Sequence, residues 1–301
     1  MMNEWQQQLL LLFSIPIYAV LIPLEILLSH FNGWKFYGWK QTAMNIYLNL
    51  ANAGVDLLLR GVAFFVLIFF YQHFHIVRYP TWHPVVYWVL LFLLEDALFW
   101  LEHFVDHHVR LFWAVHVTHH SSEEYNLTTG FRSSVLMPFY RFVYFIPLAV
   151  IGFQPVDILF MYAITQIYGI LVHTQSIGKL PRWVEYIFVT PSHHRVHHAS
   201  NIPYLDKNMG MCLIIWDRMF GTFTEEMSHE KPVYGLTKNL EKPYHPVHVI
   251  FHEWGAIIRD VKKTTSFKNK LGYLFRPPGW SHDGSSETSK ELQKKYARKG
   301  K

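Results

Sequence analysis

The chain has 301 residues, of which 51% are hydrophobic and 16% are charged. Soluble globular domains usually carry about a quarter charged residues, so this composition favours a membrane protein over a soluble one. The single cysteine excludes a disulfide framework and a metal site built from several thiolates.

Five apolar stretches predict transmembrane helices, because about 20 apolar residues of helix cross the hydrocarbon core of a bilayer. In chain order they cover residues 9–28, 48–71, 84–104, 135–153 and 156–173. The segment GFQPVD between the last two is short enough only for a hairpin turn. No basic residue precedes the first stretch and no clear cleavage site follows it, so we do not interpret it as a signal peptide.

Basic residues in the loops predict the orientation of these helices, because Lys and Arg are enriched on the cytoplasmic side. The regions after the first, third and fifth stretches hold basic residues: Lys35, Lys40, Arg110, Arg132, Lys179 and Arg182. The residues before the first stretch and the turn between the fourth and fifth hold none. We therefore expect a multi-pass protein with its N-terminus outside.

Residues 259–301 form a basic tail with twelve Lys and Arg against four Asp and Glu, whereas the whole chain has a net charge of +5. The rest of the chain is therefore net negative, which argues against a nucleic-acid partner. Such a tail suits the anionic cytoplasmic surface of a membrane, or it is simply solvated. Its composition after residue 281 predicts disorder.

Histidines are concentrated in three places, at the end of the third stretch and beyond it, at the end of the fifth stretch, and after the fifth stretch. All three places therefore lie on one predicted side of the membrane. The histidines fall in three sets with helical spacing, namely His103 and His107; His116, His119 and His120; and His194, His197 and His198. Residues three or four apart share one helix face, so each set can converge on a metal. Neutral imidazole is a common metal ligand, and burying unpaired imidazoles is costly. The pattern predicts a metal centre.

The number of histidines predicts two metal ions, because a tetrahedral zinc site takes four ligands and an octahedral site takes six. Imidazole ligands suit Zn, Cu, Fe and Ni alike, so the ligand type leaves the metal open. The H-E-x-x-H signature of zinc proteases is absent, since FHEWG at His252 lacks the second histidine.

Several neighbouring polar residues are candidates for supporting the ligands. Asp96 lies two helical turns before His103, where it can accept a hydrogen bond from a ligand's other ring nitrogen or pair at the membrane surface. His193 adjoins the third set and is a possible further ligand. Asp206 and Asn208 in YLDKNMG either orient ligands or form a turn.

The motifs HFVDH, HVTHH and HRVHH resemble the histidine boxes of the sterol desaturase and fatty acid hydroxylase superfamily, which are membrane di-iron oxygenases. Their flanking segments are similar to the alkylglycerol monooxygenase branch and its bacterial relatives, and the resemblance covers residues 85–280. A further family histidine matches His173 in LVHTQ. The resemblance thus implies nine metal ligands, His103, His107, His116, His119, His120, His173, His194, His197 and His198.

This resemblance implies an all-α membrane protein, a bundle of four or five transmembrane helices with a cytoplasmic helical cap. It implies two iron ions that use O2 to hydroxylate or desaturate a C–H bond of a lipid, such as a fatty acyl, sterol or ether lipid. Imidazoles resist such oxidants better than thiolates do. We expect N-terminal transmembrane helices over residues 1–84, a catalytic domain over 85–258, and the tail. No glycine fingerprint or haem domain supplies electrons, so we expect a redox protein or a diffusible reductant such as a tetrahydropterin.

Two positions depart from the family pattern. Phe104 stands where the family usually has Arg, and His108 stands where the monooxygenase branch usually has Glu. The second departure puts a pterin-dependent activity on ether lipids in question. His108 is an extra ligand, a residue that supports a ligand, or an exposed histidine.

A different class of function is a non-catalytic metal-binding or haem-binding membrane protein. A metal transporter needs polar residues at mid-membrane, whereas these histidines are predicted at the membrane surface. A bis-histidine haem site needs single histidines on facing helices rather than triplets. Both alternatives therefore fit the pattern less well than the oxygenase.

Overall fold

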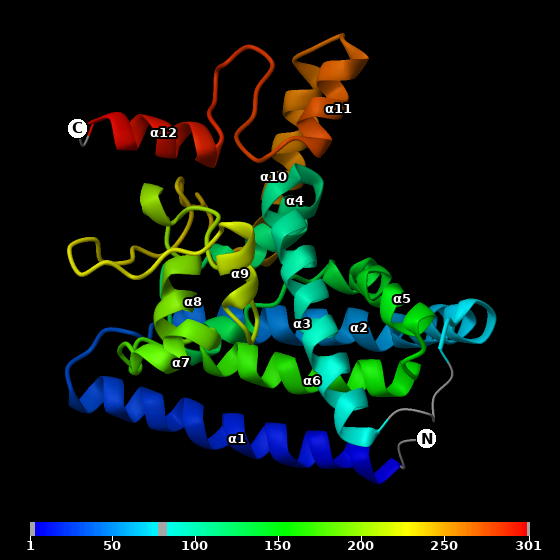
Figure 1. Cartoon of the computed structure of the whole chain (residues 1–301). Coiled ribbons are helices and arrows are strands. Elements are labelled where there is room, and N and C mark those ends of the chain that lie inside the picture. Colours follow the sequence, from blue (N-terminus) through cyan, green and yellow to red (C-terminus); the bar gives the residue numbers. More distant parts are fainter. Residues whose placement is uncertain (1–3, 78–82, 300–301) are drawn as a thin grey trace.

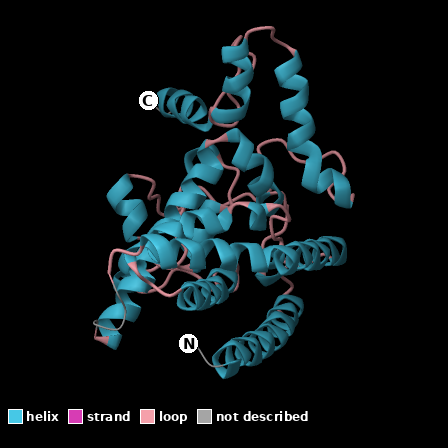
Figure 2. Cartoon of the chain, turned by 90° about the vertical axis from the view of Figure 1, so that its right-hand side faces the viewer, coloured by secondary structure: helices cyan, strands magenta, loops and turns pink. Residues whose placement is uncertain are grey.

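The computed structural model describes residues 4–77 and 83–299, in which the regular elements are helices joined by loops (Figures 1 and 2). The α-helices are α1 (Glu4–Phe31), α2 (Trp39–Phe74), α3 (Pro84–His108), α4 (Arg110–His120), α5 (Arg141–Ile151), α6 (Pro155–Leu171), α7 (Arg182–Ile187), α8 (Pro191–His197), α9 (Ile215–Phe220), α10 (Pro246–Lys262), α11 (Phe267–Phe275) and α12 (Ser289–Lys299). Short 3-10 helices are η1 (Leu127–Phe131), η2 (Met137–Phe139) and η3 (Ile202–Tyr204). Extended pairing within the described ranges is limited to two isolated bridges.

Helices α2 and α3 are long and apolar enough to cross a membrane. Only 6% of the most apolar part of α2 is buried inside the protein, and large side chains such as Leu57, Leu58 and Phe65 are exposed. A bare apolar surface of this kind suits a lipid environment. Helix α3 is more enclosed, because it packs on α4, α5 and α6. Its C-terminal turns hold His103 and His107.

The predicted fourth stretch is not one long helix. Helix α5 has 11 residues and is roughly 16 Å long at 1.5 Å per residue, about half the hydrocarbon thickness. It begins only at Arg141, whose side chain turns inward to Glu102, and the residues before it form η2 and turns. The expected hairpin between α5 and α6 is present, and Gly152 in its turn has a φ of 122° that favours glycine.

Hydrogen bonds join the loops of the bundle in two separate clusters. Backbone bonds Ile76 N to Val150 O and Val77 N to Ile151 O join the end of α2 to the α5–α6 turn. The Gln154 amide donates to the hydroxyl of Tyr87 near the start of α3. In the second cluster, the loop between α1 and α2 bonds to the segment after α4, where the Gly38 amide donates to Glu124.

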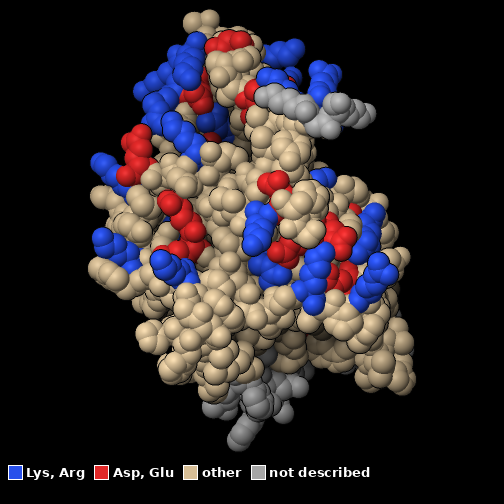
Figure 3. Space-filling view, turned by 90° about the vertical axis from the view of Figure 1, so that its left-hand side faces the viewer, with Lys and Arg blue, Asp and Glu red and all other residues tan. Residues whose placement is uncertain are grey.

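The C-terminal helices α10 and α11 pack against α4 (Figure 1), while α12 contacts η3. Arg110 of α4 forms ion pairs with Glu253 and Asp260 of α10. Figure 3 shows Lys and Arg side chains gathered over this C-terminal segment at the top. The disorder expected after residue 281 was wrong for residues 289–299. They form α12, which is held by a bond from Gln293 Nε2 to Leu205 O of 2.8 Å.

Candidate metal centre

The nine histidines that the resemblance implies as ligands come together in two groups. The five-histidine group contains His103, His107, His116, His120 and His197, and the four-histidine group contains His119, His173, His194 and His198. Within each group one nitrogen from every ring lies within 4.8 Å of the others. All of these residues are buried except His119, which is half-buried. The helices α3, α4 and α8 and the residue after the C-cap of α6 supply them.

Each histidine triplet is divided between the two groups, which the sequence did not predict. His116 and His120 lie in one group and His119 in the other; His194 and His198 lie together and His197 apart. On a helix, residue i+4 returns to within about 40° of residue i, while residue i+3 lies about 60° to the other side. The middle histidine of each triplet, His119 or His197, therefore faces the other group. The expectation that one set converges on one metal was wrong for the two triplets, whereas His103 and His107 do lie in one group.

Within each group the Nε2 atoms face one another at short distances. In the five-histidine group, His116 Nε2 lies 3.0 Å from that of His103 and 3.1 Å from that of His120. In the four-histidine group, His173 Nε2 lies 2.9 Å from His194 Nε2, 3.1 Å from His198 Nε2 and 3.3 Å from His119 Nε2. The rings thus present the same atom to a common point.

Backbone carbonyls hold the opposite ring nitrogen, Nδ1, of four of the nine histidines. His103 Nδ1 lies 2.8 Å from Met209 O and His197 Nδ1 lies 2.9 Å from Lys207 O. His119 and His173 are held in the same way by Arg132 O and Gly169 O, at 3.0 and 2.7 Å. A carbonyl only accepts, so each Nδ1 carries the hydrogen and a neutral ring keeps a lone pair on Nε2.

This arrangement fits a bound cation. The Nε2 atoms of His119 and His173 are 3.3 Å apart, yet neither neutral ring has a hydrogen to donate, because both hydrogens are used at Nδ1. Two lone pairs that face each other in a buried site are unfavourable. A metal ion bound by both rings removes that conflict. In known metal sites, too, the ligand histidines donate their other ring N–H to a carbonyl or carboxylate.

Burial keeps the rings neutral. It lowers the pKa of His119 to about 4, and with the neighbouring histidines it holds the pKa of His116, His194 and His198 well below the ordinary value. A neutral imidazole binds a metal without first losing a proton. The site is therefore ready for metal at neutral pH.

The candidates for supporting residues have different fates. Asp206 Oδ1 lies 3.1 Å from His107 Nδ1, so it can orient that ligand as predicted. The amide of Asn208 contacts none of the nine rings and instead binds the carbonyls of His193 and Thr224. The expectation that Asp96 accepts a bond from a ligand was wrong. Its carboxylate accepts from the amides of Cys212 and Leu213 and from the Trp216 indole.

The other two histidines in the motifs lie outside both groups. His108 turns back along α3, where its Nδ1 lies 2.8 Å from Phe104 O and its ring stacks on Phe104 at 3.9 Å. His193 accepts the Thr190 amide at its Nδ1 and so caps the start of α8. Neither takes the position of an extra ligand.

Two acids near the site were missed. Asp217 is fully buried and accepts from the amides of Met209 and Gly210 at 2.7 and 2.8 Å, which fixes the carbonyl that holds His103. Asp106 lies in HFVDH, and its Oδ2 is 3.7 Å from His116 Nδ1. A buried acid between two ligand histidines was the available signal for Asp106. Asp217 lies in WDRMF, whose aromatic residues are typical of core packing, so no signal pointed to it.

Comparison with known proteins identifies a family domain within the chain. Residues 88–222 match the family model described as fatty acid hydroxylase. The chain carries a fatty acid hydroxylase domain. This domain contains all nine histidines of the two groups as well as Asp106, Asp206 and Asp217. Fatty acid hydroxylases are an iron-dependent oxygenase family.

Curated relatives of the hydroxylase domain act on lipids according to their names. The chain is 35% identical to human alkylglycerol monooxygenase over 88% of its own length and 58% of the relative. It is 34% identical to the Xenopus tropicalis alkylglycerol monooxygenase, with 87% and 58% covered. It is 28% identical to the ornithine lipid hydroxylase OlsE of Rhizobium tropici, with 58% and 52% covered. The chain thus spans less than two thirds of these relatives. No solved structure gives a significant match.

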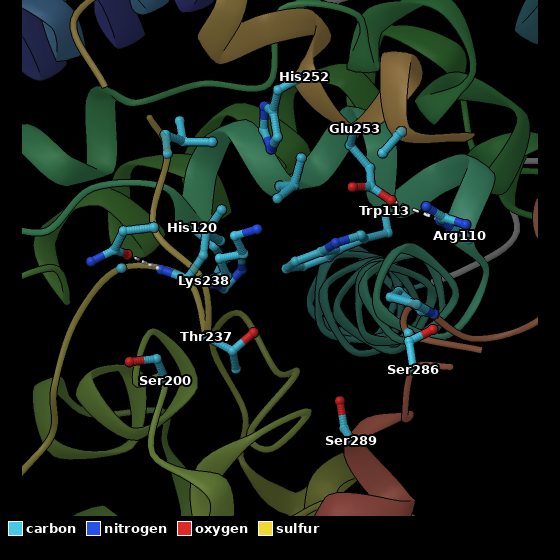
Figure 4. A pocket seen from close by; sticks show the side chains of 18 of the residues that line it. Arg110, Trp113, His120, Ser200, Thr237, Lys238, His252, Glu253, Ser286 and Ser289 are labelled. Atoms are coloured by element: carbon cyan, nitrogen blue, oxygen red, sulfur yellow. Dashed lines mark hydrogen bonds and ion pairs between the residues drawn. The ribbon is translucent and has the colours of Figure 1, made fainter. Parts of the chain in front are cut away.

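Two cavities reach the histidines of the hydroxylase domain from different sides. A cavity of about 130 Å³ touches both groups, at His103, His116, His119, His173 and His194, and is otherwise lined from α2, α3, α5 and α6 and from the segments beside them. A larger cavity of about 1260 Å³ touches His107, His120, His197 and His198 and is lined largely by residues 235–292. Figure 4 shows Trp113 projecting into the larger cavity, with Glu253 paired to Arg110 beside it.

Proposed function

We propose that this protein is a membrane-bound di-iron oxygenase that hydroxylates or desaturates a C–H bond of a lipid, using O2 and external electrons. The observation that carries the proposal is the division of nine histidines, eight buried and His119 half-buried, into two groups whose free nitrogens converge. Four and five imidazoles are each enough for one ion. The family supports iron over the other metals that suit imidazole.

The protein's own contribution is to hold and shield the metals. The five-histidine and four-histidine groups hold one iron each, and the irons supply the activation of O2. Carbonyl bonds to Nδ1 fix the tautomer and direction of the rings. Burial of the rings keeps water away from the strong oxidant that activated O2 forms. A ligand set of imidazoles without a thiolate resists damage by that oxidant. His108, His193 and Asn208 then serve the local fold rather than the metals.

We propose that the substrate is a membrane lipid that reaches the irons through the smaller cavity. That cavity is lined by Asn52 of α2, Phe99 of α3, and Tyr162 and Gln166 of α6, and the outer surface of α2 is apolar. The names of the relatives support a lipid substrate, since they include an alkylglycerol monooxygenase and an ornithine lipid hydroxylase. They also argue against the non-catalytic metal-binding or haem-binding alternative.

We propose that electrons reach the irons from the larger cavity. It is lined by polar and charged residues such as Lys238, Glu253 and Arg259, and it reaches histidines of both groups. Trp113 lines it and lies 5.1 Å from the His107 ring and 5.5 Å from the His120 ring. A redox protein or a diffusible reductant such as a tetrahydropterin approaches here, opposite the lipid.

We further propose that the metal site faces the cytoplasm and that the chain is a multi-pass membrane protein. The loops with Lys35, Lys40 and Lys179 lie at the same end of the bundle as the segment after α4, and the positive-inside rule assigns that end to the cytoplasm. Residues 1–84 then anchor the catalytic region of 85–258 in the bilayer.

Comparative lipidomics tests the proposal. Cells that express the wild-type protein are compared with cells that express His119→Ala, and the exposed His229→Ala serves as the control. We expect a lipid changed by one oxygen or by two hydrogens in the wild-type and His229→Ala cells but not in the His119→Ala cells. An identical lipidome in all three, with the protein present in the membrane, would count against an oxygenase.

A further inference from the structure

Two polar side chains beside the histidines have a buried atom that lacks a hydrogen-bond partner. They are Gln166, whose Nε2 is unpaired, and Ser134, whose Oγ is unpaired. Both residues line the cavity of about 130 Å³ that touches both histidine groups. Most buried polar groups in folded proteins are hydrogen-bonded, and each exception calls for an explanation. Two unpaired donors on the wall of one cavity point to a ligand that supplies the acceptors.

Outside the histidines, the other buried polar atoms of this cavity already have a partner. Asn52 Nδ2 donates to Ser134 O at 2.9 Å. The Arg141 guanidinium donates to Glu102 at 2.8 Å and to the hydroxyl of Tyr162. Apart from Nδ1 of His116 and of His194, Gln166 Nε2 and Ser134 Oγ are therefore the buried lining atoms left without a partner.

The charge of the cavity selects for a neutral group. Arg141 is the sole Lys or Arg among the described residues that line it, and its charge is balanced by the buried Glu102. The histidine nitrogens that face it are committed to cations in the proposed function. The charge of these cations lies at the histidine wall, so the other lining side chains leave no free positive charge beside Gln166 and Ser134 to compensate a phosphate or carboxylate there, whose burial without a partner is costly. An uncharged oxygen is the acceptor that fits.

The size of the cavity places that oxygen close to the reacting carbon. A volume of about 130 Å³ is similar to the roughly 150 Å³ of an engineered cavity that takes one benzene. It holds a short segment of a lipid rather than a whole chain, and Phe99, Ile170 and Met211 supply its apolar wall. The carbon near the histidines and the oxygen near Gln166 must belong to the same short segment.

We propose that Gln166 determines specificity by donating a hydrogen bond from Nε2 to an uncharged oxygen of the lipid near the attacked carbon. The Ser134 hydroxyl is the second donor. This inference rests on the proposed function and names its substrate class. The site takes a lipid with a hydroxyl, ester or ether oxygen close to the reacting C–H bond, and it disfavours the middle of a plain hydrocarbon chain.

Binding of probe lipids tests the inference separately from turnover. Full-length, iron-loaded protein in detergent is titrated with dodecan-1-ol, dodecane and dodecanoate, and affinities are measured by calorimetry. We expect the wild type to bind dodecan-1-ol at least about tenfold more tightly than dodecane, because a site built to donate rejects an analogue without the acceptor. Dodecanoate should show no advantage over the alcohol.

The variant Gln166→Leu should lose most of this preference while its affinity for dodecane is unchanged or higher. Its melting temperature should not fall, because the substitution removes a buried unpaired group. The matched control is Ile164→Leu on the exposed face of the same helix, which should keep the preference. With the native lipid, Gln166→Leu should raise KM more than it lowers kcat.

Three results would overturn the inference. The first is equal affinity of the wild type for alcohol and hydrocarbon, and the second is a wild type that binds neither probe. The third is a Gln166→Leu protein that keeps the preference, which would mean that a water molecule alone pairs the amide. A clear alcohol preference together with an unchanged cellular lipidome would instead remove the proposed oxygenase function and leave the binding site in place.

Discussion

Asp217 provides a test of how the loop after η3 supports the metal centre. Its carboxylate is fully buried and accepts from Met209 N at 2.7 Å, Gly210 N at 2.8 Å, Trp100 Nε1 at 3.1 Å and Thr222 Oγ1 at 2.5 Å. Hydrogen bonds to a charged group contribute about 1.5–3 kcal/mol each and are not additive. Asp217→Ala leaves these buried donors without an acceptor, at about 1–3 kcal/mol for each group, so we expect it to destabilise the protein by at least about 3 kcal/mol.

The same substitution should weaken one metal more than the other. Met209 O holds His103 Nδ1 at 2.8 Å, and loss of such outer support typically lowers metal affinity about 10- to 100-fold. The measurements are thermal unfolding in detergent and iron per chain after dialysis against a chelator. Glu225→Ala, which removes only an exposed ion pair with Lys179, is the control and should change neither. Wild-type melting and iron retention in Asp217→Ala would refute the reasoning.

Two further predictions follow from the histidine groups. His197→Ala leaves four histidines in its group and should retain more metal after chelation than His198→Ala, which leaves three; equal losses, measured by elemental analysis, would argue for a single undivided site. In metal-free protein, burial lowers the pKa of His119 and of His193 to about 4, whereas the unfolded value is about 6.5. The unfolded state thus binds more protons between these values, so the melting temperature should fall as the pH is lowered from 6.5 to 4; a constant melting temperature would contradict the buried neutral rings.

Much of the site was predictable because the histidines follow one another at helical spacing in the sequence. Imidazoles three and four residues apart on a helix mark a metal site without knowledge of the fold. The division of each triplet between the two histidine groups was not predictable in the same way, since it depends on where α3, α4 and α8 lie in space. His119 and His120 are neighbours in sequence and yet belong to different groups.

The long-range contacts were harder to predict. Asp96 was assigned to a histidine on its own helix, but it binds the backbone of residues 212 and 213, more than a hundred positions later. Asp217 was missed for the same reason, because its partners Met209 and Gly210 form a loop that sequence periodicity does not describe. The short helix α5 begins at Arg141, since that side chain is drawn inward to Glu102. Apolar composition alone predicted a longer span.

The metal content of the purified wild-type protein tests the central claim most directly. The protein is produced with iron-57, extracted in detergent, and examined by elemental analysis together with Mössbauer spectroscopy. The account predicts two iron ions per chain in nitrogen-rich sites, one for the five-histidine group and one for the four-histidine group. One zinc ion per chain, or a haem with its Soret band in place of two irons, would contradict it.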